Sequence, residues 1–268
     1  MPIIAAMPGI VSNLYATVED AWRYESDYSD YKDDLPLLSE LAAAAGGPVL
    51  ELGAGTGRVA IHLARRGIQV AALESSDGMI ELFERKLASE DVAVRNNVRI
   101  VRGDMRTASF PSRFPLILAP FNFLQLITGR AERVALLRQC HHSLVNRGKL
   151  YLEIAAPHHE LLTGKRVHQQ YVKEFFDRNR RQWVTLFQSH EYYPAEQEIT
   201  LEYLYVYHRQ DGITERIARF VTLAVIFPVE LDGLLEQAGF VVREKWGDFD
   251  KSRFGKASRR MIWLAEKP

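Results

Sequence analysis

One segment of the chain combines an acid with three glycines: residues Glu51 to Arg58 read Glu-Leu-Gly-Ala-Gly-Thr-Gly-Arg. The segment follows a short apolar run, residues 48–50, and precedes a helical pattern over residues 59–66. Glycine lets the backbone turn sharply and approach a ligand closely, because it has no Cβ. This spacing therefore predicts a strand, a tight turn and a helix that together bind a nucleotide-like ligand.

The spacing of the glycines distinguishes between two kinds of ligand. A dinucleotide-binding turn reads G-x-G-x-x-G, and its third glycine would fall at the position of Arg58. The chain instead has Glu51 followed by glycines at alternate positions, which resembles the first motif of the class I S-adenosylmethionine (AdoMet)-dependent methyltransferases. The resemblance implies that Glu51 helps to bind the ammonium group of AdoMet. It assigns the cofactor-binding turn to Gly53, Ala54, Gly55 and Gly57.

A second buried strand is predicted over residues 68–73, and it ends at Glu74. An acid about 20 residues beyond the glycine turn binds a ribose diol in nucleotide-binding sheets, because a carboxylate accepts from two adjacent hydroxyls. The resemblance adds Ser75, in the N-cap cluster of the next helix, and Met79, whose side chain would lie against adenine. The alternative for Met79 is ordinary core packing.

Two further strand ends complete the set of expected cofactor contacts. The strand over residues 98–101 is followed by Gly103, Asp104 and Met105, and in the family an acid here binds the adenine amino group. The strand over residues 116–119 ends at Ala119 and continues as Pro-Phe-Asn, up to Asn122. This exit is similar to that of small-molecule methyltransferases, in which the loop wraps the methionine end of AdoMet and opens toward the acceptor.

Candidate catalytic residues follow from position, since ligands of doubly wound sheets bind beyond the carboxyl ends of the strands. His158 and His159 come just after the fifth predicted strand, and a histidine suits the role of general base. The alternative is a pair that caps the next helix or faces solvent. Asn122 is a candidate substrate contact by the same argument.

Three tyrosines are further candidates for the acceptor pocket. Tyr24 and Tyr28 lie in an N-terminal region rich in aromatic and acidic residues, which the family often uses as a lid; the alternative is an amphipathic cover on the sheet. Tyr192 lies in the segment beyond the fifth strand, where half-buried sheets ordinarily contain aromatic residues.

Strand and helix patterns alternate through the centre of the chain, which predicts an α/β fold with a doubly wound, Rossmann-like sheet. The resemblance implies seven strands, with the last strand slotted inside the sheet. Three strand-like segments, residues 183–192, 199–209 and 213–226, predict an antiparallel β insertion with a hairpin turn at Asp211-Gly212. The expected units are an N-terminal helical lid (1–46), an AdoMet-binding core (47–157), the insertion on the acceptor side (158–227) and a C-terminal helix with a β hairpin (228–268).

Composition excludes several classes of protein. The chain has 34 basic residues (Lys and Arg) and 34 acidic residues (Asp and Glu), so its net charge is zero. This balance gives no indication of nucleic-acid binding, which usually requires a basic surface. The single cysteine, Cys140, excludes a disulfide within the chain and a cysteine-based zinc site. No set of His, Asp and Glu has metal-ligand spacing, and no stretch approaches the roughly 20 apolar residues of a membrane span. The first ten residues lack a basic region typical of signal peptides, so we expect a cytoplasmic protein.

The leading hypothesis is an AdoMet-dependent methyltransferase that acts on N or O of a small molecule. The resemblance leaves open a homodimer formed through the β insertion. The alternative is an AdoMet-binding protein of the same fold without methyl transfer, such as a sensor or a cyclase-like enzyme. A nicotinamide-dependent oxidoreductase is disfavoured by Arg58 in place of the third glycine.

Overall fold

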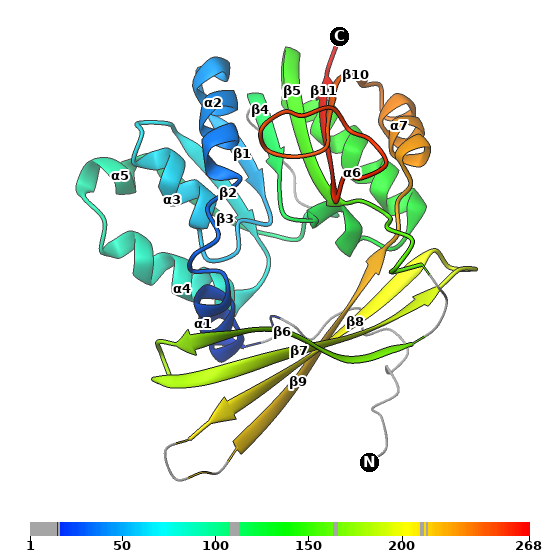
Figure 1. Ribbon diagram of the computed structural model, residues 1–268. Coiled ribbons are helices and arrows are strands. Elements are labelled where there is room, and N and C mark those ends of the chain that lie inside the picture. Colours follow the sequence, from blue (N-terminus) through cyan, green and yellow to red (C-terminus); the bar gives the residue numbers. More distant parts are fainter. Residues whose placement is uncertain (1–14, 16, 108–112, 163–165, 210–211, 213) are drawn as a thin grey trace.

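The computed structural model describes the chain except residues 1–14, 16, 108–112, 163–165, 210–211 and 213. The described part contains two sheets, and helix α1 (Val18–Asp27) lies between them (Figure 1). Asp211 of the predicted hairpin turn lies outside the described residues. The α/β fold with its antiparallel insertion and N-terminal helices is confirmed.

The larger sheet has seven strands in the order β10-β11-β5-β4-β1-β2-β3. These strands are β1 (Val49–Leu52), β2 (Val70–Glu74), β3 (Val98–Arg102), β4 (Phe114–Ala119), β5 (Leu144–Ala155), β10 (Val241–Trp246) and β11 (Arg260–Glu266). Strands β1 to β5 run parallel, and β11 is antiparallel to both of its neighbours. The last strand is therefore slotted inside the sheet, as expected.

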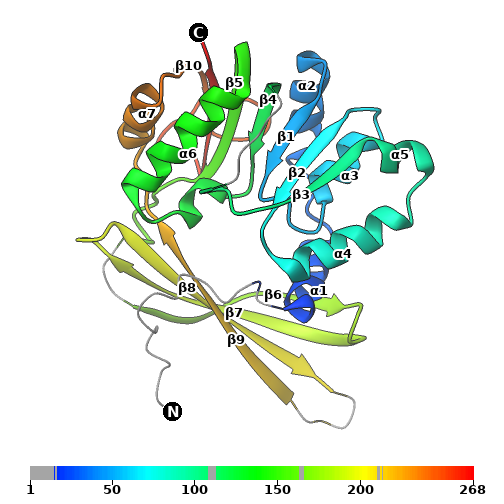
Figure 2. The same cartoon turned by 180° about the vertical axis from the view of Figure 1, so that it is seen from behind.

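Helices cover both faces of this sheet, because each side of the parallel strands is apolar and must be kept from water. On one face lie α2 (Leu35–Ala45), α3 (Arg58–Ala64) and α4 (Asp77–Ala88), with the short α5 (Val92–Asn96) beside them. On the other lie α6 (Arg130–Ser143) and α7 (Pro228–Gln237) (Figure 2). Cys140 is buried in that second layer, and burial raises the pKa of its thiol to about 12. No helix of the described part is long and apolar enough to cross a membrane.

The second sheet contains four antiparallel strands in the order β6-β7-β8-β9. They are β6 (Val167–Asp177), β7 (Gln182–Tyr193), β8 (Glu198–His208) and β9 (Thr214–Ala224). The prediction of three strands was wrong in number, because it missed β6. This edge strand has two register shifts against β7 and mostly exposed side chains, so its sequence lacks the alternation that marks a half-buried strand.

Helix α1 is held to both halves of the molecule. At its start Thr17 and Asp20 form a capping box, and Gly78 of α4 lies against the Thr17 backbone, where a Cβ would collide. The Asp20 carboxylate also accepts hydrogen bonds from Arg23 of α1 and Arg219 of β9. Contacts with α4 and with the second sheet thus determine where α1 lies.

Candidate active site

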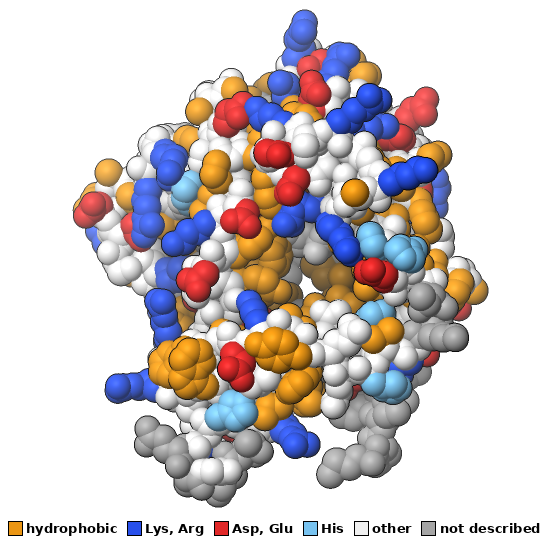
Figure 3. Space-filling view, in the orientation of Figure 1, with side chains coloured by type: hydrophobic (Ala, Val, Ile, Leu, Met, Phe, Trp, Pro, Cys, Tyr) orange, Lys and Arg blue, Asp and Glu red, His pale blue; other side chains and the backbone are white. Residues whose placement is uncertain are grey.

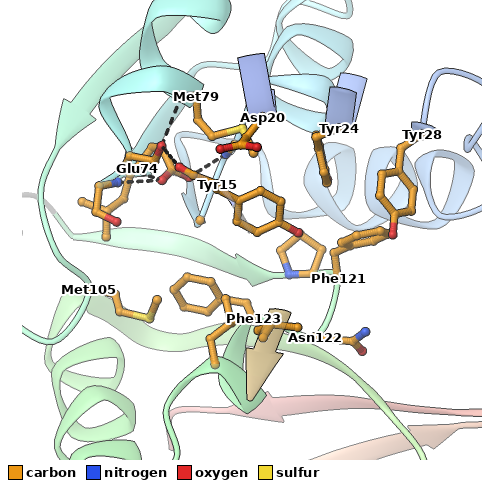
Figure 4. Close-up of a pocket in the computed structure, with 18 of the residues that line it drawn as sticks. Tyr15, Asp20, Tyr24, Tyr28, Glu74, Met79, Met105, Phe121, Asn122 and Phe123 are labelled. Carbon is orange, nitrogen blue, oxygen red and sulfur yellow. Dashed lines mark hydrogen bonds between the residues drawn. The ribbon is translucent and has the colours of Figure 1, made fainter. Parts of the chain in front are cut away.

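A cavity of about 350 Å³ lies where the carboxyl ends of β1, β2 and β4 face α1 and the second sheet. Figure 3 shows a hollow between the two parts of the molecule, in which hydrophobic side chains gather. Ligands bind at this edge of doubly wound sheets. The cavity is therefore the candidate active site, and Figure 4 shows the residues around it.

The glycine turn after β1 forms one wall of the cavity, through Gly53 and Gly55. Both have a positive φ, +66° and +56°, which glycine adopts without the strain that a Cβ would add. A Cβ on Gly53 would collide with the ring of Phe123, and one on Gly57 with the ring of Phe83. The turn therefore needs these glycines both for its backbone conformation and for its close packing.

Glu51 lies behind this turn and is 2% exposed. Burial raises the pKa of its carboxyl to about 8, against the opposing attraction of Arg58. Its Oε2 has no hydrogen-bond partner among the described residues. A buried acid with an unpartnered oxygen fits a cationic ligand group, because an ammonium would supply both a donor and a compensating charge.

Glu74 ends β2 beside this turn and lines the same wall of the cavity. Its Oε2 accepts from Gly55 N, and its Oε1 accepts from Ser75 N and Ser76 N, each at 2.8 Å. The carboxylate therefore links the glycine turn to the start of α4. A carboxylate oxygen has more than one acceptor site, so these bonds leave capacity for ligand hydroxyls.

The remaining predicted cofactor residues divide into two groups. Ser75, Met79, Gly103 and Met105 line the cavity. The other residues do not line it: Ala54, Gly57 and Ala119 lie in the turn and in β4, and Asp104 pairs with Arg106. The hydrogen bonds from Arg106 hold the pKa of Asp104 below its ordinary value. The contact of Asp104 with adenine stays a prediction.

Tyrosine side chains form much of the opposite wall. Tyr24 and Tyr28 come from α1, while Tyr203 and Tyr205 come from one face of β8. Burial raises the pKa of all four hydroxyls above the ordinary value, to about 12 for Tyr203. At neutral pH these groups are uncharged phenols, which donate and accept hydrogen bonds but do not act as phenolate bases.

The loop after β4 reaches the cavity with an unusual backbone. Phe121 and Asn122 have positive φ values of 58° and 63°, although neither is glycine. Both line the cavity, as does Phe123 at the start of the short helix η1 (Phe123–Leu126). The structure therefore places Asn122 where the sequence predicted a substrate contact.

Three of the predicted residues lie elsewhere. His158 and His159 follow β5 but do not line the cavity, and their rings pack against each other with centroids 4.9 Å apart. His158 Nδ1 lies 3.5 Å from Glu160 Oε2. Tyr192 is buried in an apolar cluster of the second sheet with Ile199. Sequence proximity to a strand end therefore did not bring His158 and His159 to the lining of the cavity.

The sequence analysis did not single out several residues of the site. Asp20 and Arg23 line the cavity, and Arg23 donates to the hydroxyl of Tyr207 across the boundary with the second sheet. The only signal in the sequence was the alternating aromatic face of β8, which includes Tyr203 and Tyr205. Among the described residues no group of three or more His, Cys, Asp or Glu could hold a metal ion.

Comparison with known proteins finds a family match over the part of the chain that contains the glycine turn and Glu74. The family described as "Methyltransferase domain" matches residues 49–148. The cypemycin N-terminal methyltransferase of Streptomyces sp is 32% identical over 112 residues, 42% of this chain and 43% of that protein. The demethylmenaquinone methyltransferase of Clavibacter sepedonicus is 28% identical over 174 residues, 58% of this chain and 69% of that protein. The chain spans about half the length of the first curated relatives that it matches.

Solved structures extend the likeness over both sheets. The CcbJ methyltransferase from Streptomyces caelestis superposes with a TM-score of 0.76 at 25% identity, covering 91% of this chain and 96% of that one. CalS10, an amino pentose methyltransferase from Micromonospora echinaspora, has a TM-score of 0.70 at 20% identity, covering 92% and 97%. At 20% identity, the likeness to CalS10 shows only that the two proteins share a fold.

The doubly wound sheet, the glycine turn and the acids Glu51 and Glu74 together form a Rossmann-like fold with a candidate ligand site. Residues 49–148 match the methyltransferase-domain family, and the likeness to CcbJ extends over both sheets, so the chain is similar to class I AdoMet-dependent methyltransferases.

Proposed function

We propose that this protein transfers the methyl group of AdoMet to the nitrogen of an amine on a small molecule. Bound AdoMet supplies a methyl group that its sulfonium has already activated. The transfer is then an in-line displacement, for which the protein must provide orientation and a site from which water is excluded.

The cofactor residues that we propose fit the parts of AdoMet. The unpartnered Oε2 of Glu51 would accept from the ammonium group, and the turn at Gly53 and Gly55 would lie along the amino-acid tail. Glu74 would accept from the ribose hydroxyls, and Met79 would pack against adenine.

The choice of nitrogen rests on one observation, the lack of an available base at the cavity. The charged side chains among its described lining residues are those of Asp20, Arg23 and Glu74. Burial opposes the ionisation of Asp20, but hydrogen bonds from Arg23 and Arg219 keep its pKa below the ordinary value, so it is a weak base. Glu74 accepts three backbone hydrogen bonds and is the proposed acceptor for the ribose hydroxyls, so it is occupied by the cofactor and is not available as a base.

An alcohol needs a base that removes its proton during the transfer, whereas an uncharged amine presents a free lone pair. A cavity walled by neutral tyrosines therefore favours an amine that arrives deprotonated. Structural neighbours support this acceptor class: CalS10 is an amino pentose methyltransferase, KedS8 a sugar N-methyltransferase and MtfA a glycopeptide N-methyltransferase. Among the curated relatives, however, are ubiquinone biosynthesis O-methyltransferases.

The test compares acceptors that differ only at the reacting atom. The protein is incubated with methyl-labelled AdoMet and a panel of amino sugars and other small amines, each paired with its hydroxyl analogue. We expect label in amine members of the panel and none in their hydroxyl partners. Transfer to the hydroxyl members alone would contradict the choice of nitrogen. AdoMet binding without transfer to any acceptor would favour the sensor or cyclase-like alternative.

Three further expectations stay predictions. They are the homodimer through the β insertion, the cytoplasmic location and the domain boundaries at residues 46, 157 and 227. Size-exclusion chromatography with light scattering tests the first of them directly.

A further inference from the structure

The loop that carries Phe121 and Asn122 into the cavity is strained. Two consecutive non-glycine residues adopt left-handed backbone angles, which cost conformational free energy because of the clash between each Cβ and the backbone. Such a conformation persists only where the surrounding structure imposes it.

A single residue of β5 contacts the backbone of both Phe121 and Asn122. Glu153 is 3% exposed, and its side-chain Oε2 accepts a hydrogen bond from Phe121 N at 3.0 Å. Its backbone carbonyl accepts from Asn122 N at 3.1 Å. Glu153 thus binds both N–H groups of the strained pair, although it does not line the cavity itself.

The orientation of the loop matters because the Phe121 ring contacts the acceptor wall. Its centroid lies 4.9 Å from that of Tyr28 and 5.4 Å from that of Tyr31, in edge-to-face geometry. On another side the guanidinium of Arg58 lies 5.9 Å from the ring centroid. A change in the Phe121 backbone would therefore move the ring that supports Tyr28.

We propose that Glu153 is a positioning residue for methyl transfer: it holds Phe121 and Asn122 in the left-handed conformation that shapes the acceptor pocket. The proposal rests on the proposed function for its catalytic consequence. It assigns a role to a buried acid that the sequence analysis did not identify.

The charged groups around Glu153 come from several elements. They are Asp34 before α2, Arg58 of α3 and Arg260 of β11, whose Nη1 lies 3.7 Å from Glu153 Oε1. The hydroxyls of Tyr31 and Tyr151 also interact with it electrostatically. Burial raises the pKa of Glu153 to about 7, although the Phe121 hydrogen bond opposes that rise. An ionised acceptor forms the stronger hydrogen bond, so the loop is held more firmly as pH rises through 7.

The experiment compares the full-length wild type with Glu153→Leu and Glu153→Gln. Leucine removes the side-chain acceptor, whereas the glutamine carbonyl can still accept from Phe121 N. We expect Glu153→Leu to lower kcat at least tenfold and to change the Kd for AdoMet by less than threefold. Glu153→Gln should recover most of kcat. Glu266→Gln, which alters a buried acid on β11 away from the cavity, is the matched control.

The pH dependence supplies a second readout that does not need the leucine variant to fold. The ratio of wild-type to Glu153→Gln kcat/KM should rise as pH increases from 6 to 8. Acceptor ionisation affects both enzymes alike, so it cancels in this ratio. A flat ratio would overturn the proposal, and so would a kcat that is unaffected in Glu153→Leu or lost equally in both variants.

Failure of the inference is distinct from failure of the proposed function. If the wild type methylates an amine and both Glu153 variants match it, only the positioning role is wrong. If the wild type methylates no acceptor, the proposed function fails and the catalytic role of Glu153 fails with it. Amide exchange at Phe121 and Asn122, faster in Glu153→Leu than in Glu153→Gln, would then still report whether Glu153 holds the loop.

Discussion

The two walls of the cavity are built in different ways. The cofactor wall is built around a backbone turn, the glycine turn after β1, together with Glu74 at the end of β2; Glu51 is buried behind that turn. The acceptor wall consists of side chains from α1, from the loop after β4 and from β8, which are far apart in the sequence. A backbone wall demands particular residues at particular spacings, whereas many sequences can supply an aromatic wall. The first is therefore recognisable in a sequence and the second is not.

The largest effect is expected on the free energy of unfolding, when a glycine of the turn after β1 is replaced. Gly57→Ala should lower the free energy of unfolding by about 2–4 kcal/mol, since it adds left-handed strain and a collision with the Phe83 ring. Gly67→Ala is the control: its φ is also +80°, but a Cβ there meets open space, so about 1 kcal/mol is expected. Urea unfolding measures both. Equal losses would mean that Phe83 moves aside without cost and that packing does not require this glycine.

The next largest effect is expected on the affinity for AdoMet, when an acid of the cofactor wall is replaced. Glu74→Ala should weaken AdoMet binding by about 1.5–3 kcal/mol, the range for hydrogen bonds to a charged group. Asp77→Ala, three residues later and with a largely exposed side chain, should leave the affinity unchanged. Isothermal titration calorimetry measures both variants. Unchanged affinity in Glu74→Ala would contradict its assignment to the ribose.

A smaller effect is expected on the acceptor wall. Tyr28→Ala removes a ring that packs against Tyr24 and Phe121, which should lower kcat/KM for the acceptor by about tenfold. The Kd for AdoMet should stay within a factor of about two, because Tyr28 lies on the opposite wall. The control is Tyr171→Ala, an exposed tyrosine on β6 that does not line the cavity. A parallel loss of AdoMet affinity would show that the two walls are not independent.

The smallest expected effect is the release of a proton from Glu51 when AdoMet binds. The pKa of Glu51 is raised from 4.5 to about 8, so at pH 7 the folded protein holds a proton that the unfolded chain has released. Its contribution to stability therefore falls as pH rises from 4.5 to 8. An ammonium beside Glu51 would lower its pKa, so AdoMet binding at pH 7 should release up to about one proton. Calorimetry in buffers of different ionisation enthalpy measures this release, and Glu51→Gln should abolish it; release that persists in that variant would place its source elsewhere.

Prediction from sequence succeeded where local geometry dictated the residue. The turn glycines have positive φ values, so a side chain would be strained there, and Glu74 stands at the end of a strand whose apolar run is evident. Prediction failed for β6, because an exposed edge strand does not need polar and apolar residues at alternate positions. It placed His158 and His159 in the site by sequence position, although neither lines the cavity.

The sequence by itself determined the strand–turn–helix unit, the alternation of strand and helix and the acids at the strand ends. Each of these follows from the conformational limits of a few neighbouring residues. Only the tertiary structure decided that α1 and β8 come together in one wall of the cavity, that Asp104 pairs with Arg106 and that Glu153 accepts a hydrogen bond from Phe121 N. These outcomes depend on contacts between segments distant in the chain and on burial, which no local pattern of residues encodes.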